Sequence, residues 1–231
     1  MPDPLVLLPG MMADARVFWP QIIALSMETS VQIAPVFHQE TVDAVARTVL
    51  EQAPARFALA GHGLGAIVAM EVLRQDPARI TKLVLISTTC QQELPNLAAS
   101  REPLIAKARA GRLAQAIEPE LTCAAAAPGP DQQELVALAK QMAFTLGTEV
   151  FIRQSRMMQR RPDQQSTLRR AKTPTLVICG EHDIVYPVRR HEFMAHLMPN
   201  AQLEVVGETA HYPMLERPDH VTGVLRDWLG L

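Results

Sequence analysis

The chain has 231 residues, of which 48% are hydrophobic and 20% are charged, so it can fold around a sizeable core and is not intrinsically disordered. Its 22 Lys and Arg residues against 24 Asp and Glu residues give a formal net charge of −2 at pH 7. That balance lacks the basic excess of proteins that bind nucleic acids or anionic membranes, so we expect neither as a partner. The sequence leaves the oligomeric state open.

The cysteines and the N-terminus indicate a compartment. Cys90, Cys123 and Cys179 are odd in number, far apart and free of any C-x-x-C pair, which fits a reducing environment. The N-terminus has no basic region, and its apolar run breaks at Pro9, so it does not read as a signal peptide. No apolar run approaches the roughly 18 residues that a membrane span needs. We therefore expect a cytoplasmic protein.

Short apolar runs alternate with amphipathic stretches along the chain. The runs, which predict buried strands, cover residues 5–8, 31–37, 57–60, 83–86, 175–179 and 203–206. The stretches, which predict helices, cover residues 14–27, 41–52, 65–75, 188–197 and 217–229. Strands alternating with helices favour right-handed crossovers, so the expected class is α/β, with a mostly parallel sheet flanked by helices.

The alternation is interrupted once, between Thr88 and Pro174, where helical patterns follow one another without a convincing strand. Pro and Gly residues divide this span into about four short helices, with a loop over 124–130. We therefore expect a core made of residues 1–88 and 173–231 and an inserted helical cap over 89–172.

Residues 57–66, FALAGHGLGA, predict a strand, a glycine-rich turn and the start of a helix. One interpretation is a dinucleotide site, because Gly61, Gly63 and Ala66 fit G-x-G-x-x-A. A ribose-binding carboxylate is then expected about 20 residues further on, at the end of the next strand. That strand ends instead in Ser-Thr-Thr-Cys, and the motif lies in the middle of the strand series, so this interpretation is disfavoured.

The other interpretation is the nucleophile elbow, G-x-S-x-G, whose sharp turn exposes the central side chain above the sheet. Gly61 and Gly65 match its outer positions, but position 63 is glycine where Ser, Cys or Asp is needed. Glycine tolerates the strained backbone of such a turn and supplies no attacking group.

Two later segments each place a polar side chain just after a predicted strand. Asp183 follows the strand at 175–179, and His211 follows the strand at 203–206. The carboxyl ends of parallel strands share one edge of the sheet, where open α/β folds build their sites. An Asp there can fix the tautomer of a His, which then moves protons for a nucleophile, and the chain order elbow, acid, base fits hydrolases.

With these residues the sequence resembles the α/β-hydrolase superfamily, in particular its short bacterial members that begin at an LLPG-type strand. The resemblance covers essentially the whole chain: LLPG at 7–10 with Trp19 downstream, GHGLG at 61–65, RPD at 161–163, GEHDIVYP at 180–187, and His211 followed by ERP at 216–218. It implies the α/β-hydrolase fold.

The resemblance also implies roles for five residues. Asp183 is the triad acid, His211 is the triad base, and the amides of Met11 and Leu64 form the oxyanion hole. Gly63 occupies the nucleophile position, which is the one departure from the pattern.

Several other residues are candidates for the pocket. Methionine side chains adapt to irregular shapes and suit an acyl or alkyl group. The pocket residues we expect are Met12, Met142, Met157, Met158 and Tyr212.

For three other histidines we expect no role in catalysis or metal binding. We expect His62 to pack beneath the elbow. His191 and His196 are five residues apart, which does not place two ligands on one helical face, so we expect a solvated helix and no metal.

The function expected is a serine-hydrolase-type enzyme that cleaves a small-molecule carboxylic ester or thioester of a small, partly apolar acid, without a cofactor. Glycine at 63 inactivates it, and an engineered Ser-to-Gly change is the favoured origin. The alternatives are a C–C bond hydrolase or lyase on the same site, and a non-catalytic pseudo-hydrolase that binds an acyl ligand.

Overall fold

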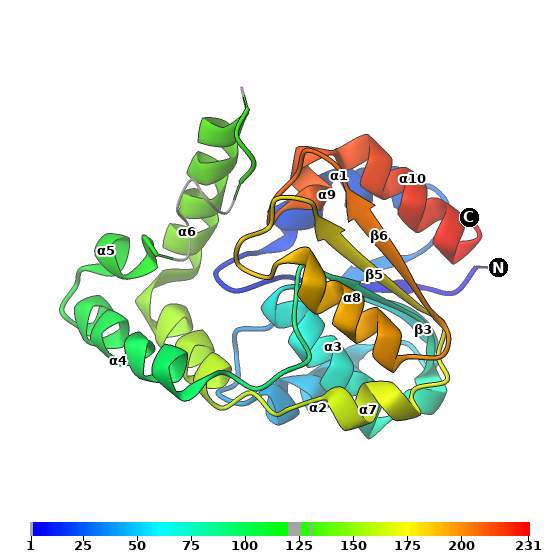
Figure 1. The fold of residues 1–231 in the computed structure, drawn as a ribbon, viewed down its shortest axis with the longest axis horizontal. Coiled ribbons are helices and arrows are strands. Elements are labelled where there is room, and N and C mark those ends of the chain that lie inside the picture. Colours follow the sequence, from blue (N-terminus) through cyan, green and yellow to red (C-terminus); the bar gives the residue numbers. More distant parts are fainter. Residues whose placement is uncertain (1, 120–125, 130) are drawn as a thin grey trace.

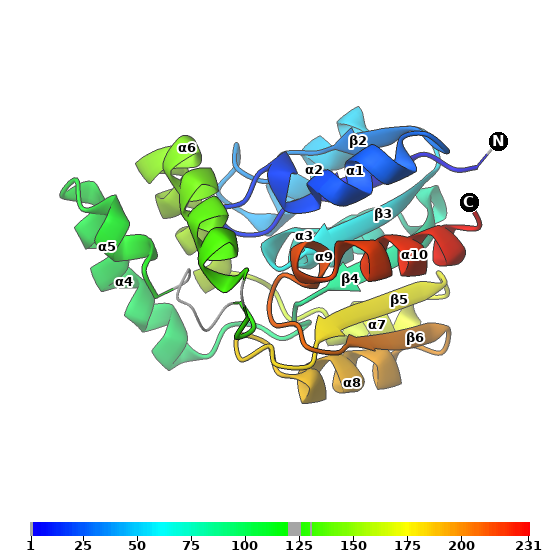
Figure 2. The same ribbon diagram turned by 90° about the horizontal axis from the view of Figure 1, so that it is seen from above.

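The computed structural model describes residues 2–119, 126–129 and 131–231, and its centre is a parallel sheet (Figures 1 and 2). The six strands lie in the order β2-β1-β3-β4-β5-β6, and every neighbouring pair is parallel. Their bounds are β1 Leu5–Leu8, β2 Val31–Ile33, β3 Phe57–His62, β4 Ile80–Ile86, β5 Thr175–Gly180 and β6 Ala201–Val206. The predicted α/β class with a parallel sheet is confirmed.

Helices cover both faces of this sheet. One face carries α1 (Trp19–Leu25), α10 (Pro218–Leu229) and the short α9 (Pro213–Glu216), with the 3-10 turn η1 (Ala15–Phe18) before α1. The other face carries α2 (Val42–Gln52), α3 (Leu64–Gln75), α7 (Gln165–Arg170) and α8 (Val188–Leu197), and the 3-10 turn η2 (Pro77–Arg79) leads into β4.

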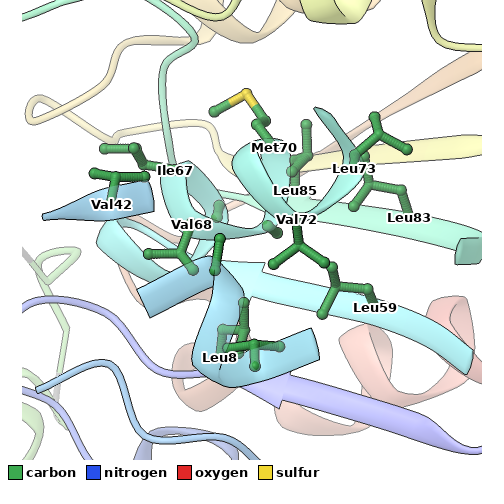
Figure 3. Packing of buried hydrophobic residues seen from close by; sticks show 14 of the residues in the cluster. Leu8, Val42, Leu59, Ile67, Val68, Met70, Val72, Leu73, Leu83 and Leu85 are labelled. Carbon is green, nitrogen blue, oxygen red and sulfur yellow. The ribbon is translucent and has the colours of Figure 1, made fainter. Parts of the chain in front are cut away.

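Each face of the sheet has its own hydrophobic core, and successive side chains of β1 point into one core and then the other. Leu5 and Leu7 pack in the core beneath α1 and α10, whereas Val6 and Leu8 pack in the core beneath α2, α3 and α8. Figure 3 shows the second core, in which side chains of α3 meet those of β3 and β4. Because all four positions of β1 are fully buried, the strand is fixed in register at the centre of the fold.

Strand boundaries differ from those predicted in five of the six strands, and the two largest differences concern β2 and β4. The strand predicted over 31–37 ends at Ile33, because Pro35 has no N–H for the ladder. The strand predicted over 83–86 begins earlier, at Ile80, where it pairs with Phe57.

The segment between β4 and β5 contains no strand in the residues that the structure describes. It contains α4 (Pro95–Arg109), α5 (Leu113–Ile117) and α6 (Gln132–Gln159), which stand beyond one end of the sheet (Figure 2), and then α7, which packs on α3 and α8 of the core. Gly147 interrupts α6 with φ 80° and ψ −177°, so the two halves of that helix differ in direction. The loop predicted over 124–130 lies largely outside the described residues.

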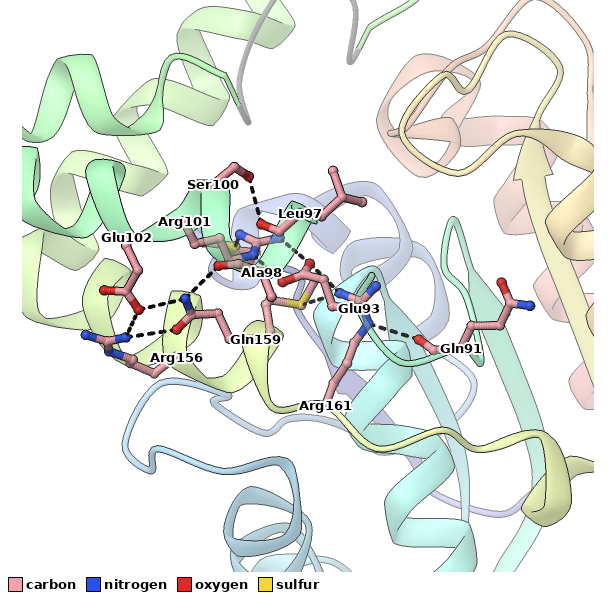
Figure 4. A network of polar contacts seen from close by, with 12 residues as sticks. Gln91, Glu93, Leu97, Ala98, Ser100, Arg101, Glu102, Arg156, Gln159 and Arg161 are labelled. Carbon is pink, nitrogen blue, oxygen red and sulfur yellow. Dashed lines mark hydrogen bonds and ion pairs between the residues drawn. The ribbon is translucent and has the colours of Figure 1, made fainter. Parts of the chain in front are cut away.

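A polar cluster joins α4 to the C-terminal end of α6 (Figure 4). The buried Glu93 carboxylate accepts hydrogen bonds from Arg101 at 2.8 Å and from Arg161 at 2.7 Å. Burial alone would raise the pKa of Glu93, but these guanidinium groups outweigh it and hold the pKa below its usual range. Gln159 of α6 also donates to the carbonyl of Ala98 at 2.8 Å. These bonds fix the cap helices relative to one another.

Among the described residues, one helix, α6, has the length and apolar composition to cross a membrane, with 33% of its most apolar window buried. Long core helices share that length and composition, so this is weak evidence for a membrane span.

Candidate active site

The turn between β3 and α3 has the backbone of an elbow. Gly63 has φ 52° and ψ −115°, a conformation that L-residues rarely adopt, and α3 begins at the next residue, Leu64. The Gly63 N–H donates to the carbonyl of Ile86 on β4 at 2.9 Å, and its carbonyl accepts from the Thr88 hydroxyl at 2.9 Å. The turn is therefore held at both ends by the neighbouring strand and its loop.

The three glycines of this turn are present for different reasons. A Cβ at Gly61 would lie 2.5 Å from the Ala66 nitrogen, and a Cβ at Gly65 would lie 2.1 Å from the Leu8 oxygen. Neither position has room for a side chain, because the helix and the strands approach there backbone to backbone. A Cβ at Gly63 would meet nothing closer than 3.7 Å, so that position is open and only its positive φ favours glycine.

Asp183, the expected acid, follows β5, and the loop around it supplies hydrogen bonds to its carboxylate. One carboxylate oxygen of Asp183, Oδ1, accepts from the N–H groups of Val185 at 2.8 Å and Tyr186 at 2.9 Å. The other, Oδ2, lies 3.0 Å from Nδ1 of His211. Burial alone would raise the pKa of Asp183, but the charge and hydrogen bond of His211 and the Tyr186 N–H outweigh it, so the pKa lies below its usual value.

His211, the expected base, faces the open position of the elbow. Because the Asp183 carboxylate accepts from Nδ1–H, neutral His211 carries its lone pair on Nε2. That Nε2 is the atom that lies 3.7 Å from the Cβ position at Gly63. The loop holding His211 is organised by Glu216, which accepts from the N–H groups of Ala210 at 3.0 Å and Tyr212 at 2.9 Å. Burial raises the pKa of Glu216 in spite of these bonds.

Two buried histidines lie near the pair. His62 is the last residue of β3, its ring lies against those of His211 and Tyr212, and its Nε2 lies 3.0 Å from the carbonyl of His211. Burial together with the charge of His211 lowers its pKa to about 3. His191 is also fully buried, so the solvated helix predicted for it is wrong. Its Nε2 accepts the N–H of Thr88 at 2.9 Å, and burial lowers its pKa to about 4.

The two expected oxyanion donors are backbone amides of the segments that follow β1 and β3. The Leu64 N–H is one of the unpaired amides at the start of α3, and the Met11 N–H has no acceptor among the described residues. One cavity reaches both of these residues and His211. It is lined by Met11, His62, Gly63, Leu64, Met158, Val185, Tyr186, His211 and Tyr212.

Of the expected pocket residues, the structure brings Met158 and Tyr212 to this cavity. Met12 and Met142 are buried in the core beneath α1 and α10, and Met157 is buried in the opposite core, so none of these three lines it. Met157 and Met158 belong to the same buried cluster, and of the two it is Met158 that reaches the cavity.

Sequence reasoning missed the side chains that support the site through bonds between distant segments. Thr88 holds the Gly63 carbonyl, and Gln154 accepts from the Met12 N–H at 2.8 Å. Neither belongs to a motif with a recognisable spacing. Glu216 was visible only as part of the ERP motif.

Comparisons with known proteins agree with this architecture. A family model described as serine aminopeptidase, S33, matches residues 36–218. A pimeloyl-[acyl-carrier protein] methyl ester esterase of Nitrosomonas europaea is 24% identical over 188 residues, which cover 78% of this chain and 74% of that protein. Another of that name, from Nitrosospira multiformis, is 26% identical over 185 residues, or 74% and 67%.

Solved structures show the same fold. A thermophilic esterase from Thermogutta terrifontis with malate bound superposes with a TM-score of 0.87 at 24% identity, covering 98% of this chain and 89% of that one. The enol-lactonase from Burkholderia xenovorans LB400 gives a TM-score of 0.87 at 20% identity, covering 100% and 92%.

Proposed function

This chain belongs to the α/β-hydrolase family described as serine aminopeptidase, S33, and from that premise we propose that it is a carboxylic ester hydrolase of the serine type that lacks its nucleophile. The chain as it stands binds an ester or acyl ligand and turns it over poorly. A hydroxyl at position 63 completes the catalytic group. The proposal holds whether the glycine is natural or introduced.

One observation carries the proposal. The Cβ position at Gly63 is open and lies 3.7 Å from His211 Nε2, so a serine Oγ, one bond further out, can come within hydrogen-bonding reach of the base. The elbow keeps the φ of a nucleophile turn, and the flanking glycines keep the close approach that the turn requires.

The Gly63→Ser chain would act in two steps. The introduced Oγ attacks the ester carbonyl while its proton passes to His211 Nε2, and the Asp183 carboxylate stabilises the imidazolium that forms. The Met11 and Leu64 amides face the developing oxyanion. Protonated His211 then gives its proton to the leaving alcohol, and water activated by His211 releases the acid.

The substrate class we propose is an ester or thioester of a small, partly apolar acid. Met11, Met158 and Tyr212 give the cavity an apolar wall beside the polar pair, which suits an acyl chain. The curated relatives are named for a methyl ester carried on an acyl-carrier protein, so aliphatic methyl esters are the first substrates to test after activated esters.

A second candidate is a pseudo-hydrolase that binds an acyl compound without cleaving it. The absence of a side chain at Gly63 favours it, since loss of a triad nucleophile costs on the order of a million-fold in turnover. The two candidates differ in what one added hydroxyl restores.

The test compares the chain that has Gly63 with Gly63→Ser and Gly63→Ala on p-nitrophenyl acetate and butyrate. Both variants carry the same backbone strain, and only one carries a hydroxyl, so Gly63→Ala is the matched control. We expect turnover in Gly63→Ser alone, and its loss on adding His211→Ala. A folded but inert Gly63→Ser chain would favour the pseudo-hydrolase. Activity in the chain with Gly63 that depends on His211 would instead indicate attack by water or a lyase reaction.

A further inference from the structure

The segment that carries the expected oxyanion donor Met11 is a strained turn. Residues 10–13 form a four-residue turn closed by the Ala13 N–H and the Gly10 carbonyl at 3.2 Å. Met12, at its third position, has φ 52°, a value that type II turns require and that usually selects glycine. A methionine in that conformation persists only where its surroundings hold it.

The side chain of Gln154, on α6, stabilises this turn. Gln154 of α6 is fully buried, and its Oε1 accepts the Met12 N–H at 2.8 Å while its Nε2 donates to the carbonyl of Val36 at 3.2 Å. The partners fix the orientation of the carboxamide, because an N–H needs the oxygen and a carbonyl needs the NH₂ group. Gln154 therefore hydrogen-bonds to two loops, which follow the neighbouring strands β1 and β2.

We propose that Gln154 is a positioning residue for the oxyanion hole. In a trans peptide the N–H and C=O point in opposite directions, and the Gly10 carbonyl is turned toward Ala13, so the Met11 N–H points away from the turn. Gly10 Cα lies 3.8 Å from the Cβ position at Gly63, which places this peptide beside the elbow. By fixing the next peptide, Gln154 keeps the Met11 N–H aimed where negative charge develops.

Because the Gln154–Met12 hydrogen bond joins the cap to the core, oxyanion stabilisation depends on how α6 packs against the core. The hydrogen bond joins residues 142 positions apart, and Gln154 lies in the half of α6 that follows the bend at Gly147. The inference rests on the proposed function, because an oxyanion forms only when an ester is attacked.

The test uses the full chain carrying Gly63→Ser, with Gln154→Leu added, and measures kcat and KM on p-nitrophenyl acetate. We expect kcat to fall at least tenfold with KM changed less than twofold, since an oxyanion donor acts on the transition state. Gln159→Leu is the matched control: it removes a glutamine from the same helix that bonds only within the cap, and kcat should change less than twofold. If Gln154→Leu fails to fold, Gln154→Met takes its place.

Hydrogen exchange of the Met12 amide, measured in the chain that keeps Gly63, separates the possible failures. Gln154→Leu should speed that exchange at least tenfold, and Gln159→Leu should not. Faster exchange with an unchanged kcat would overturn the inference and leave the proposed function intact. Unchanged exchange would overturn it as well, because the hydrogen bond would then not hold the turn. An inert Gly63→Ser parent contradicts the proposed function instead, and the inference falls with it.

Discussion

The two sides of the site differ in how complete they are. On the side of β5 and β6, the proposed acid and base are hydrogen-bonded to each other: Asp183 accepts two backbone N–H groups and bonds to His211, and Glu216 organises the loop that carries His211. On the side of β3, the elbow has its turn, its close packing and its free amide, and the central side chain is absent.

This contrast shows that the backbone of the site does not depend on the nucleophile. The positive φ at residue 63 follows from the packing of Gly61 and Gly65 against neighbouring backbone and from the bonds that Ile86 and Thr88 make with the turn. A side chain at 63 adds chemistry to a turn that exists without it. The predictions below test whether the two sides then act as one unit.

The largest effect is expected from separating the acid from the base. In the Gly63→Ser chain, Asp183→Asn should lower kcat on the order of ten thousand-fold, because an amide no longer holds His211 in the tautomer with a free Nε2. Stopped-flow or steady-state kinetics on p-nitrophenyl acetate measure it. An effect under tenfold would mean that the two sides do not work together.

The glycines of the elbow should differ in their effect on stability. Gly65→Ala should lower the free energy of unfolding by about 3 kcal/mol or more, because its Cβ would overlap the Leu8 carbonyl. Gly63→Ala should cost only about 1–2 kcal/mol, the strain of a positive φ without overlap. Urea unfolding of both variants checks the order, and equal losses would refute the view that residue 63 is open.

Acid should destabilise the fold through His62. Its folded pKa of about 3 lies below its unfolded value near 6.5, so the unfolded chain binds more protons, and stability falls as the pH drops below 6.5. At pH 5 this histidine should account for about 2 kcal/mol of the loss from pH 8. His62→Gln should make the loss of unfolding free energy between pH 8 and pH 5 about 2 kcal/mol smaller, as measured by urea unfolding at both pH values, and an unchanged loss would contradict this assignment.

The sequence was informative where chemistry and periodicity are local. Apolar runs located the six strands, and the GEHDIVYP and His211 motifs located two residues that the structure places 3.0 Å apart. It was uninformative where bonds join distant segments. The hydrogen bond between Gln154 and Met12 depends on how α6 packs against the core, and the burial of His191 against Thr88 depends on how α8 packs. No local sequence pattern encodes either arrangement.

The central claim, that every part of a serine hydrolase except one hydroxyl is in place, is tested most directly by covalent labelling. A fluorophosphonate reacts with an activated serine and needs no knowledge of the substrate. After incubation at neutral pH, mass spectrometry should show one adduct on the introduced serine of the Gly63→Ser chain, and none on the chain with Gly63 or on Gly63→Ser with His211→Ala. A folded Gly63→Ser chain that remains unlabelled, or one labelled equally without His211, would contradict the account.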